Sequence, residues 1–365
     1  MLNTLRQSRF GFASAALILF LIAGCNMPAA STPTPDLFAT LQASTPLTAF
    51  TPNPLETPTP APLISNPVDL PTATASPIST DGVPSPTAAD GLTGHIVFTC
   101  QIFKVQASNQ ICIMNADGTG FRRLTTDNNR QHFYPSLSPD GRSVLYSGFF
   151  EKNNYEIYEL TIADGALKRL TNIFTIETAP EFSPDGERII FARENPSTQR
   201  FQLIMMSSNG KEEDNVPNVT GWDPTWSPDG SQILFASDKR GPVQLFKVNP
   251  NGKGLKVITD LPAIRGRSDW SADGRSIVTY SGPAWNRELY IMSADGTNSH
   301  QLTPSGGNSQ GPSFSPDGKW VVFTSYFDNY GDDNGCEIYV IRVDGTDLRR
   351  LTNNDYCDYQ PRWGP

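Results

Sequence analysis

Between residues 94 and 365, apolar and polar residues follow one another in short runs that recur along the chain. One kind of run is continuously apolar, with β-branched and aromatic residues. A second kind alternates residue by residue, as in Glu156–Leu160 and Glu288–Met292. Both patterns are typical of β-strands, and the alternating one indicates a strand with one buried face. The six apolar runs are His95–Phe98, Val144–Tyr146, Ile189–Phe191, Ile233–Phe235, Ile277–Thr279 and Val321–Phe323.

Two kinds of turn separate these runs. Ser-Pro-Asp-Gly, once written Ser-Ala-Asp-Gly, recurs at intervals of 44 or 45 residues. Its proline presets the first corner of a type I turn, and its glycine takes the left-handed position. Asp-Gly or Asn-Gly, a strong hairpin signal, follows each alternating run. A repeat of this length predicts a propeller or solenoid array. The aspartates of the first turn are Asp140, Asp185, Asp229, Asp273 and Asp317.

The number of repeats predicts how a ring of blades would close. Six apolar runs and six Asp-Gly hairpins are present, but only five Ser-Pro-Asp-Gly turns accompany them. The missing first strand matches Tyr359–Trp363, which resembles Asp223–Trp226. Pairing of this segment with His95–Phe98 would close the ring and remove exposed sheet edges. We therefore expect an all-β fold over residues 94–365, a six-bladed β-propeller of four-stranded antiparallel blades.

The repeats resemble the WD-like β-propeller repeats of the TolB family. The resemblance rests on Ser-Pro-Asp-Gly, on the apolar strand after it, and on the series Glu-Ile-Tyr, Asp-Gly and Arg-Leu-Thr; it covers all of residues 94–365. It implies the fold rather than one activity, because similar repeats form the propellers of prolyl oligopeptidases, tricorn-type proteases and some polysaccharide lyases. TolB proteins carry an α/β domain ahead of the propeller, where this chain is rich in Pro, Thr and Ser.

Residues 1–24 have the pattern of a signal peptide. Arg6 and Arg9 precede an apolar run over residues 13–23, which is short for a membrane span. The segment Ile22–Cys25 resembles a bacterial lipobox. We therefore expect cleavage before Cys25 and attachment of lipid to its thiol, which would hold the protein at a membrane surface. An ordinary signal peptide with a chance cysteine is the alternative.

Residues 25–93 form a stretch of Pro, Thr, Ser and Ala that cannot bury enough apolar surface to offset the entropy of ordering. A disordered tether is expected between the lipid anchor and the propeller. The net charge is −9, and no basic cluster is present, so nucleic acid is an improbable partner. We expect a monomer outside the cytoplasm, anchored to the bacterial cell membrane at its outer surface or in the periplasm.

Four further cysteines lie among the repeats. Cys100 and Cys112 flank one loop, whereas Cys336 opens the last alternating run and Cys357 precedes the closing segment. Four cysteines allow three pairings, and an extracytoplasmic location permits oxidation. Topology favours one disulfide between Cys100 and Cys112 and another between Cys336 and Cys357. A zinc site is the alternative, but the spacing does not match a zinc finger and the chain has only three histidines.

The repeat predicts which side of the ring carries function. The Ser-Pro-Asp-Gly and Asp-Gly turns would share one side, the turn face. The loops from second to third strand, and those joining successive blades, would share the other, the loop face. Only these loops differ between blades, and exposed Tyr, Trp and Arg are typical interface anchors. The candidate binding residues, mostly around the mouth of the central channel, are His132, Tyr134, Glu177, Trp222, Asp223, Arg265, Arg267, Trp285, Tyr359 and Gln360.

Two local motifs point weakly to chemistry. Residues 328–337 are dense in oxygen ligands and glycine, so Asp328, Asp332 and Asp333 are candidate calcium ligands, although the EF-hand spacing is absent. A solvated acidic loop is the alternative, and no other cofactor is expected. Gly307–Gly311 matches Gly-x-Ser-x-Gly, but that motif requires a strand, a turn and a helix in an α/β sheet, so we reject a nucleophile elbow here.

Three functional hypotheses remain from the sequence. The first is a non-catalytic binding or scaffold protein of the cell envelope that presents its loop face to a protein or a cell-wall glycan. The second is a polysaccharide lyase or hydrolase built from groups at the channel mouth, such as His132, Glu177, Asp223 and Arg267. The third is a permanent accessory subunit of an envelope complex. The sequence shows no catalytic triad and no metal-ligand cluster, which favours the first hypothesis.

Overall fold

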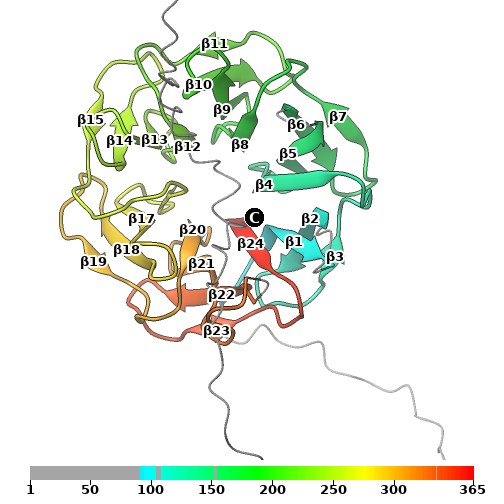
Figure 1. Cartoon of the computed structure of the whole chain (residues 1–365), viewed down its shortest axis with the longest axis vertical. Helices are drawn as coiled ribbons and strands as arrows, with labels where there is room; N and C mark the ends of the chain where they lie inside the picture. The colour runs from blue at the N-terminus through cyan, green and yellow to red at the C-terminus, as the bar shows by residue number, and fades with distance from the viewer. Residues whose placement is uncertain (1–90, 104–107, 152–153, 334) are drawn as a thin grey trace, which may run out of the picture. The chain divides into compact units, whose positions relative to one another are not determined.

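Six four-stranded antiparallel sheets stand around a common centre (Figure 1). The computed structural model describes residues 91–103, 108–151, 154–333 and 335–365. The expected signal peptide, the lipid attachment at Cys25 and residues 25–90 of the expected tether lie outside these residues. The described part consists of strands and loops, and no helix in it is long and apolar enough to cross a membrane. The prediction of an all-β, six-bladed propeller is confirmed.

Each blade contains four strands that follow one another outward from the centre. The innermost strands are β24 (Asp358–Gly364), β4 (Gln131–Leu137), β8 (Glu177–Phe182), β12 (Trp222–Trp226), β16 (Asp269–Trp270) and β20 (Gln310–Phe314). The second strands are β1 (His95–Ile102), β5 (Ser143–Glu151), β9 (Arg188–Asn195), β13 (Ile233–Ser237), β17 (Ser276–Ser281) and β21 (Trp320–Ser325). The third strands are β2 (Ser108–Asn115), β6 (Asn154–Thr161), β10 (Arg200–Ser207), β14 (Gln244–Val248), β18 (Glu288–Ser293) and β22 (Glu337–Arg342). The outer strands are β3 (Arg122–Arg123), β7 (Leu167–Arg169), β11 (Asp214–Asn215), β15 (Lys256–Val257), β19 (His300–Gln301) and β23 (Arg349–Arg350).

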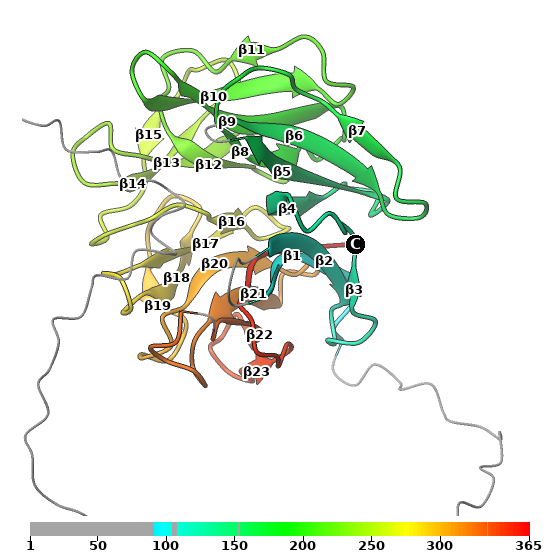
Figure 2. The same cartoon turned by 45° about the vertical axis from the view of Figure 1, so that its right-hand side comes forward.

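The ring closes with one strand from the C-terminal segment and three from the start of the described chain. The sheet order is β24-β1-β2-β3, with Ile96 opposite Trp363 and Cys100 opposite Asp358. In Figures 1 and 2, β24 (red) lies beside β1 (cyan). Because β24 gives β1 a hydrogen-bonded neighbour, the first blade has the same four strands as the others, and the predicted closure is confirmed.

The turn face is stabilised by the same polar contact in five blades. In each Ser-Pro-Asp-Gly or Ser-Ala-Asp-Gly turn, the serine Oγ donates to the aspartate Oδ1 over 2.5–2.7 Å. The glycine that follows has φ between 67° and 72°, a left-handed conformation in which glycine carries no steric penalty. The serine and the aspartate of the turn therefore bind each other. This structural role explains why the motif recurs in five blades without a ligand to bind.

Apolar side chains fill the spaces between adjacent blades. One cluster joins the first and last blades and contains Phe98, Met114, Trp320 and Trp363. Phe98 and Trp320 are almost completely inaccessible to solvent. Burying such aromatic side chains contributes about 1.5–3 kcal/mol each. The core of this fold is thus a set of contacts between blades, and the closing strand takes part in one of them.

Candidate functional site

Each innermost strand is interrupted at an equivalent position near its loop-face end. Five of the six pairings with the second strand shift register there, as a β-bulge does. Five of the bulge residues precede proline, which disfavours the right-handed helical region, and all five have φ between 50° and 61°. We call the six equivalent residues the loop-side ring: Tyr134, Ala179, Asp223, Arg267, Gly311 and Gln360.

Arg267 reaches across the loop-side ring. Its Nη2 donates to the carbonyl oxygen of Pro135 over 2.9 Å, and its guanidinium carbon lies 5.3 Å from the centre of the Tyr134 ring. These contacts join the blade of Arg267 to the opposite blade. The backbone N–H of Arg267 donates to Asp223 Oδ2 over 2.9 Å. Gly266 allows this approach, because a Cβ at that position would collide with the Asp223 carboxylate.

A second ring lies two residues further along each innermost strand, toward the turn face. We call it the deep ring, and Arg362 is its cation. The Arg362 guanidinium lies 3.3 Å from Glu181 Oε2 and 3.5 Å from Asp269 Oδ2, and it donates to the carbonyl oxygen of Ser268. The deep ring consists of Ser136, Glu181, Thr225, Asp269, Ser313 and Arg362.

The carboxylates of the deep ring also bind the next blade. Glu181 Oε1 accepts from Thr225 Oγ1 over 2.7 Å, and Asp269 Oδ2 accepts from Ser313 Oγ over 2.8 Å. Burial raises the pKa of Glu181 and of Asp223. Burial, followed by repulsion from Arg362, lowers the pKa of Arg267 to about 10. The centre of the ring is therefore a desolvated network of charges that connects the blades across the middle.

Buried polar atoms without a hydrogen-bond partner gather in the half of the blades that faces the loops. Among the described residues that carry such atoms, only Trp226 and Trp270 lie at the turn-face end, and Arg362 lies between the two halves. The remaining residues are Gln110, Ser147, Asn154, Glu177, Thr178, Asp223, Arg267, Arg287, Asn308 and Thr324. Native proteins leave few buried polar groups unsatisfied, and in this protein most of those that remain lie in the loop-facing half.

Several sequence-derived candidates are buried, and the prediction of exposed anchors is wrong for them: His132, Tyr134, Glu177, Asp223, Arg267 and Tyr359. His132 packs against Tyr146, its Nδ1 lies 3.2 Å from the Asn109 carbonyl oxygen, and burial lowers its pKa to about 4. Glu177 pairs with Arg193 in its own blade. Aromatic and charged residues of the innermost strands thus make contacts between strands and between blades. The sequence alone did not distinguish these residues from residues of exposed loops.

The remaining candidates lie nearer the surface. Trp222 is half-buried, and its Nε1 donates to the carbonyl oxygen of Arg265, whose side chain is exposed. Gln360 is half-buried and accepts hydrogen bonds from the backbone N–H of Tyr134 and from Thr99 Oγ1. The structure therefore brings Tyr134, Asp223, Arg267 and Gln360 together in one ring, as their position in the repeat implies, but it does not bring His132 or Glu177 to that centre.

A family model described as TolB beta propeller domain matches residues 90–285 and 255–365, which together include every described strand. The chain belongs to this family. An uncharacterised protein of Agrobacterium fabrum is 35% identical over 97 residues, 26% of this chain and 31% of that protein. Tol-Pal system protein TolB of Francisella tularensis subsp. mediasiatica is 35% identical over 77 residues, 21% of this chain and 18% of that protein. These matches span less than a third of either relative.

The structural comparison agrees at the level of the fold. The crystal structure of TolB from Acinetobacter baumannii matches with a TM-score of 0.66 and 23% identity, covering 75% of this chain and 67% of that one. The similarity thus establishes the TolB-type propeller. The partner of this chain has to be argued from its own loops.

In this TolB-type propeller, the loops of the last two blades form an aromatic cluster on the loop face. The half-buried Trp285 meets Tyr326 and Tyr330 edge-on, with ring centres 5.0 and 5.9 Å apart. The Tyr330 hydroxyl donates to the Trp285 carbonyl oxygen, yet 54% of Tyr330 is exposed. Phe103 and Phe174 are exposed on other loops of the same face. Tyr330, Phe103 and Phe174 are thus exposed aromatic side chains on this face; Trp285, the named candidate, is half-buried beside Tyr330, and its binding role stays a prediction.

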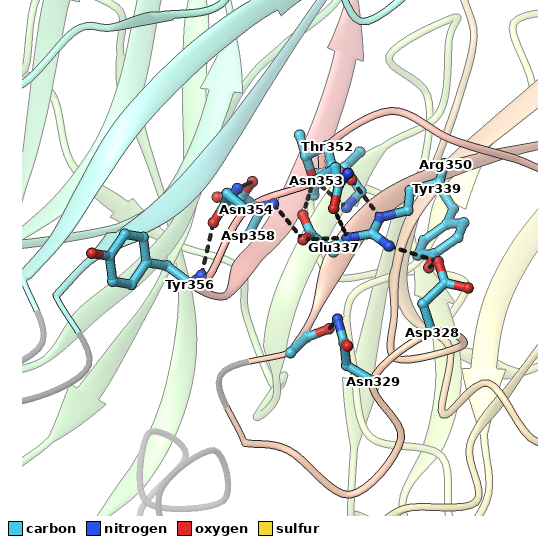
Figure 3. A network of polar contacts seen from close by, with 12 residues as sticks. Asp328, Asn329, Glu337, Tyr339, Arg350, Thr352, Asn353, Asn354, Tyr356 and Asp358 are labelled. Carbon is cyan, nitrogen blue, oxygen red and sulfur yellow. Dashed lines mark hydrogen bonds and ion pairs between the residues drawn. The ribbon is translucent and has the colours of Figure 1, made fainter. Parts of the chain in front are cut away.

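The acidic loop of the last blade is tied to its own sheet. Asp328 Oδ2 accepts from the Tyr339 hydroxyl over 2.7 Å and from Arg350 over 2.8 Å, and Arg350 also pairs with Glu337 (Figure 3). Nowhere in the described ranges do three acidic, histidine or cysteine side chains gather as metal ligands would. The calcium hypothesis for Asp328, Asp332 and Asp333 gains no support from these contacts and stays a prediction.

Both expected disulfides are present at the loop-face ends of their strands. Cys100 is joined to Cys112 and Cys336 to Cys357. The second bond connects β22 to the segment just before β24. It therefore fixes the closing strand covalently to the last blade, while hydrogen bonds attach it to the first. A disulfide of this kind stabilises a domain by about 2–4 kcal/mol.

Asp358, the first residue of β24, gives the closing strand a dependence on pH. Its carboxylate is buried and accepts from Asn354 Nδ2 over 2.8 Å (Figure 3), and burial, reinforced by the charge of Glu337, raises its pKa to about 7. An unfolded aspartate titrates near pH 3.9. The folded state therefore binds the proton more tightly between these values, and this contribution to stability is lost as pH rises from about 4 to 7.

We expect Asp358→Asn to remove the loss of stability that the natural protein shows as pH rises from about 4 to 7. The variant should be more stable than the natural protein at pH 8, by up to about 4 kcal/mol, with the difference shrinking toward pH 4. Urea unfolding at a series of pH values measures it, with Asp355→Asn in the exposed part of the same loop as the control. A difference that grows toward low pH would show that Asp358 is ionised in the folded state.

Four charged residues near the centre were not among the residues predicted from the sequence: Glu181, Asp269, Arg287 and Arg362. A signal for three of them does exist. The deep ring holds serine or threonine in three blades, namely at Ser136, Thr225 and Ser313, and a charged residue in the other three. Two acids and one base at equivalent repeat positions would predict an ion pair across a closed ring. Arg287 lies in a variable loop, where no comparable repeat signal exists.

Proposed function

We propose that this protein is a non-catalytic binding protein of the cell envelope, held at a membrane by lipid on Cys25, and that its loop face takes a protein partner. One observation carries the proposal: exposed aromatic side chains (Tyr330, Phe103 and Phe174) lie on the loop face, and most of the unpaired buried polar atoms lie in the half of the blades beneath it. On the turn face, the corresponding serines and aspartates bind each other. Exposed aromatic side chains on a rigid scaffold are typical of a protein interface.

The relatives support a protein partner over a glycan. One of them is named as a component of the Tol-Pal system, and a named system implies assembly with other proteins. The match covers only 21% of this chain, so the partner itself is argued from chemistry. Exposed Tyr330 and half-buried Trp285 offer adjoining aromatic surface over the buried Tyr326, and exposed Arg265 borders the centre of the same face. An exposed aromatic surface favours a partner with apolar side chains.

The enzyme hypothesis draws less support from the observed contacts. His132 and Glu177, two of its four proposed groups, are engaged in contacts between or within blades. The other two, Asp223 and Arg267, bind each other through the Arg267 backbone N–H. No nucleophile lies beside a base in these contacts. We therefore propose binding as the role of the loop face and treat turnover of a glycan as an outcome that the test can reveal.

The test is capture of partners by the full chain in detergent-solubilised envelope, followed by mass spectrometry of bound proteins and analysis of a cell-wall glycan pool for cleavage. Combined Trp285→Ala and Tyr330→Ala should weaken capture at least about 30-fold, because loss of one aromatic anchor costs about 2 kcal/mol or more. Phe121→Ala is a matched control, since Phe121 is 56% exposed and lies on the turn face. Equal loss in both variants, or glycan fragments without a retained protein, would contradict the proposal.

A further inference from the structure

Pairs of buried carboxyl groups lie at two of the six contacts between neighbouring blades. Glu156, near the start of β6, faces Glu177 of the next blade, and Glu337, at the start of β22, faces Asp358 of the first blade. All four side chains are at most 1% exposed. We call these two places the acidic contacts. Two carboxylates that share a desolvated space repel each other, so such a pair tends to keep one proton.

The glutamate of each acidic contact holds the loop that joins the two blades. It accepts hydrogen bonds from an arginine, from a threonine and from a backbone N–H of that loop. For Glu156 these donors are Arg169, Thr171 and Ile173. For Glu337 they are Arg350, Thr352 and Asn354 (Figure 3). Both glutamates are therefore surrounded by donors that suit the ionised form.

Glu177, the second acid of one contact, has poorer partners. Its Oε1 lies 2.6 Å from Arg193, but Arg193 also binds both carboxylate oxygens of Glu213. The Oε2 atom of Glu177 has no hydrogen-bond partner among the described residues. Burial, only partly offset by the charge of Arg193, raises the pKa of Glu177 to about 7.

Asp358 is the second acid of the other contact. Hydrogen bonds from Asn354 and Thr352 favour its ionised form, whereas burial and the charge of Glu337 oppose it and raise its pKa to about 7 (Figure 3). The residue opposite on β1 is Cys100, which is disulfide-bonded and does not titrate. The same pair of acids therefore occurs at both contacts with the same tendency to retain a proton.

An equivalent contact elsewhere in the ring shows what the proton replaces. Between the blades β16–β19 and β20–β23, the corresponding residues are Glu288 and Ser309. Glu288 accepts from Thr303 Oγ1 and from the backbone N–H of Gly306, each over 2.7 Å, and it also accepts from the Ser309 hydroxyl. A neutral O–H donor thus stands where the acidic contacts have a second acid. A carboxyl group can donate in this way only while it carries a proton.

We propose that one proton at each acidic contact holds the neighbouring blade-joining loop, residues 171–176 or 353–357, and that pH thereby regulates the loop face. With the proton, Glu177 or Asp358 takes the place of the serine hydroxyl. Without it, two carboxylates repel each other in a desolvated space, and the loop opens to water. The first loop carries the exposed Phe174, and the second leads into the closing strand. Regulation of binding rests on the proposed function, whereas the loosening of the loops does not.

The direction of the pH effect follows from the two states of the loop. In the closed loop the second acid has a pKa of about 7, and in the open loop it meets water and titrates near 4. The closed form therefore binds the proton more tightly. Opening should become more frequent as pH rises from about 4 to 7 and should level off above that range. From pH 5 to pH 8 the open fraction should rise at least about tenfold.

The direct test is hydrogen exchange of the full-length protein from pH 5 to pH 9, read by mass spectrometry after reduction of the disulfides and corrected for intrinsic exchange rates. Protection of residues 171–177 and 353–358 should fall at least about tenfold between pH 5 and pH 8 and then stay constant. Residues 303–309, at the serine contact, are the internal control and should change less. Combined Glu177→Gln and Asp358→Asn should remove the pH dependence, and Ser309→Asp should transfer it to residues 303–309.

The natural protein decides the proposal even if a variant fails to fold. Protection that is independent of pH, or that falls equally at the serine contact, would overturn it, as would a pH dependence that persists in the double variant. Capture of envelope proteins at pH 6 and pH 8 tests the regulatory part: it should weaken toward pH 8 in the natural protein only, and equal capture would refute regulation. Falling protection with no captured protein at either pH would instead contradict the proposed function and leave the loosening established.

Discussion

Deletion of β24 and the final residue, 358–365, should abolish cooperative unfolding of the propeller. The strand supplies the innermost position of the first blade, the buried Trp363 and the central cation Arg362. Truncating a buried tryptophan alone costs about 3–5 kcal/mol, and domains of this kind have about 5–15 kcal/mol in total. The deletion also leaves an unpaired edge on β1, which favours association between molecules. Calorimetry and size-exclusion chromatography measure both effects.

Trp363→Phe provides the graded control for this deletion. It keeps the hydrogen bonds of β24 and the disulfide from Cys357 but loses the bond from Trp363 Nε1 to the Thr93 carbonyl oxygen. We expect a cooperative transition with a free energy of unfolding lower by about 1–2 kcal/mol. If the truncated chain unfolds cooperatively within about 1 kcal/mol of the full chain, the closure of the ring is not the source of its stability.

Arg362→Met should be among the most destabilising single substitutions in this chain. It leaves Glu181 and Asp269 without their shared cation, and unpairing buried charges costs about 3–5 kcal/mol. Both carboxylates are 18% exposed, so we expect about 3 kcal/mol at pH 8. Burial already raises the pKa of Glu181, and loss of the cation raises it further. The variant should therefore regain stability as pH falls from 8 toward about 4, because Glu181 takes up a proton in that range and its unpaired charge disappears.

The rescue variant identifies the cause. Combining Arg362→Met with Glu181→Gln and Asp269→Asn removes the charges that were left unpaired, so most of the lost stability at pH 8 should return. Urea unfolding at pH 4, 6 and 8 distinguishes the cases. A loss that is the same at all three values, or that persists in the triple variant, would show that Arg362 acts through packing and not through its charge.

The blades could be predicted well because the residues that specify each blade lie close together in the sequence. The Asp-Gly hairpins and the turns around Asp140 or Asp185 each specify a strand pair within one repeat. Their count gave the number of blades, and the match between Tyr359–Trp363 and Asp223–Trp226 gave the closing strand. The disulfides followed, since topology placed the two cysteines of each pair near one another on the loop face.

The centre of the ring was largely not predictable, because its contacts join residues that are far apart in the sequence. Arg362 pairs with Glu181 and Asp269, and Arg267 binds the carbonyl oxygen of Pro135. Only closure brings these residues together. The same limit explains His132, which reads as an exposed loop residue but packs between two blades.

The central claim is that partners bind the loop face and not the turn face. The most direct test places a photo-crosslinking amino acid at Tyr330 or at Phe121, two sites of similar exposure on opposite faces, in the full-length protein in intact cells. A discrete protein adduct from position 330, absent from position 121, is the predicted result. An adduct from position 121 alone would place the interface on the turn face and contradict the account.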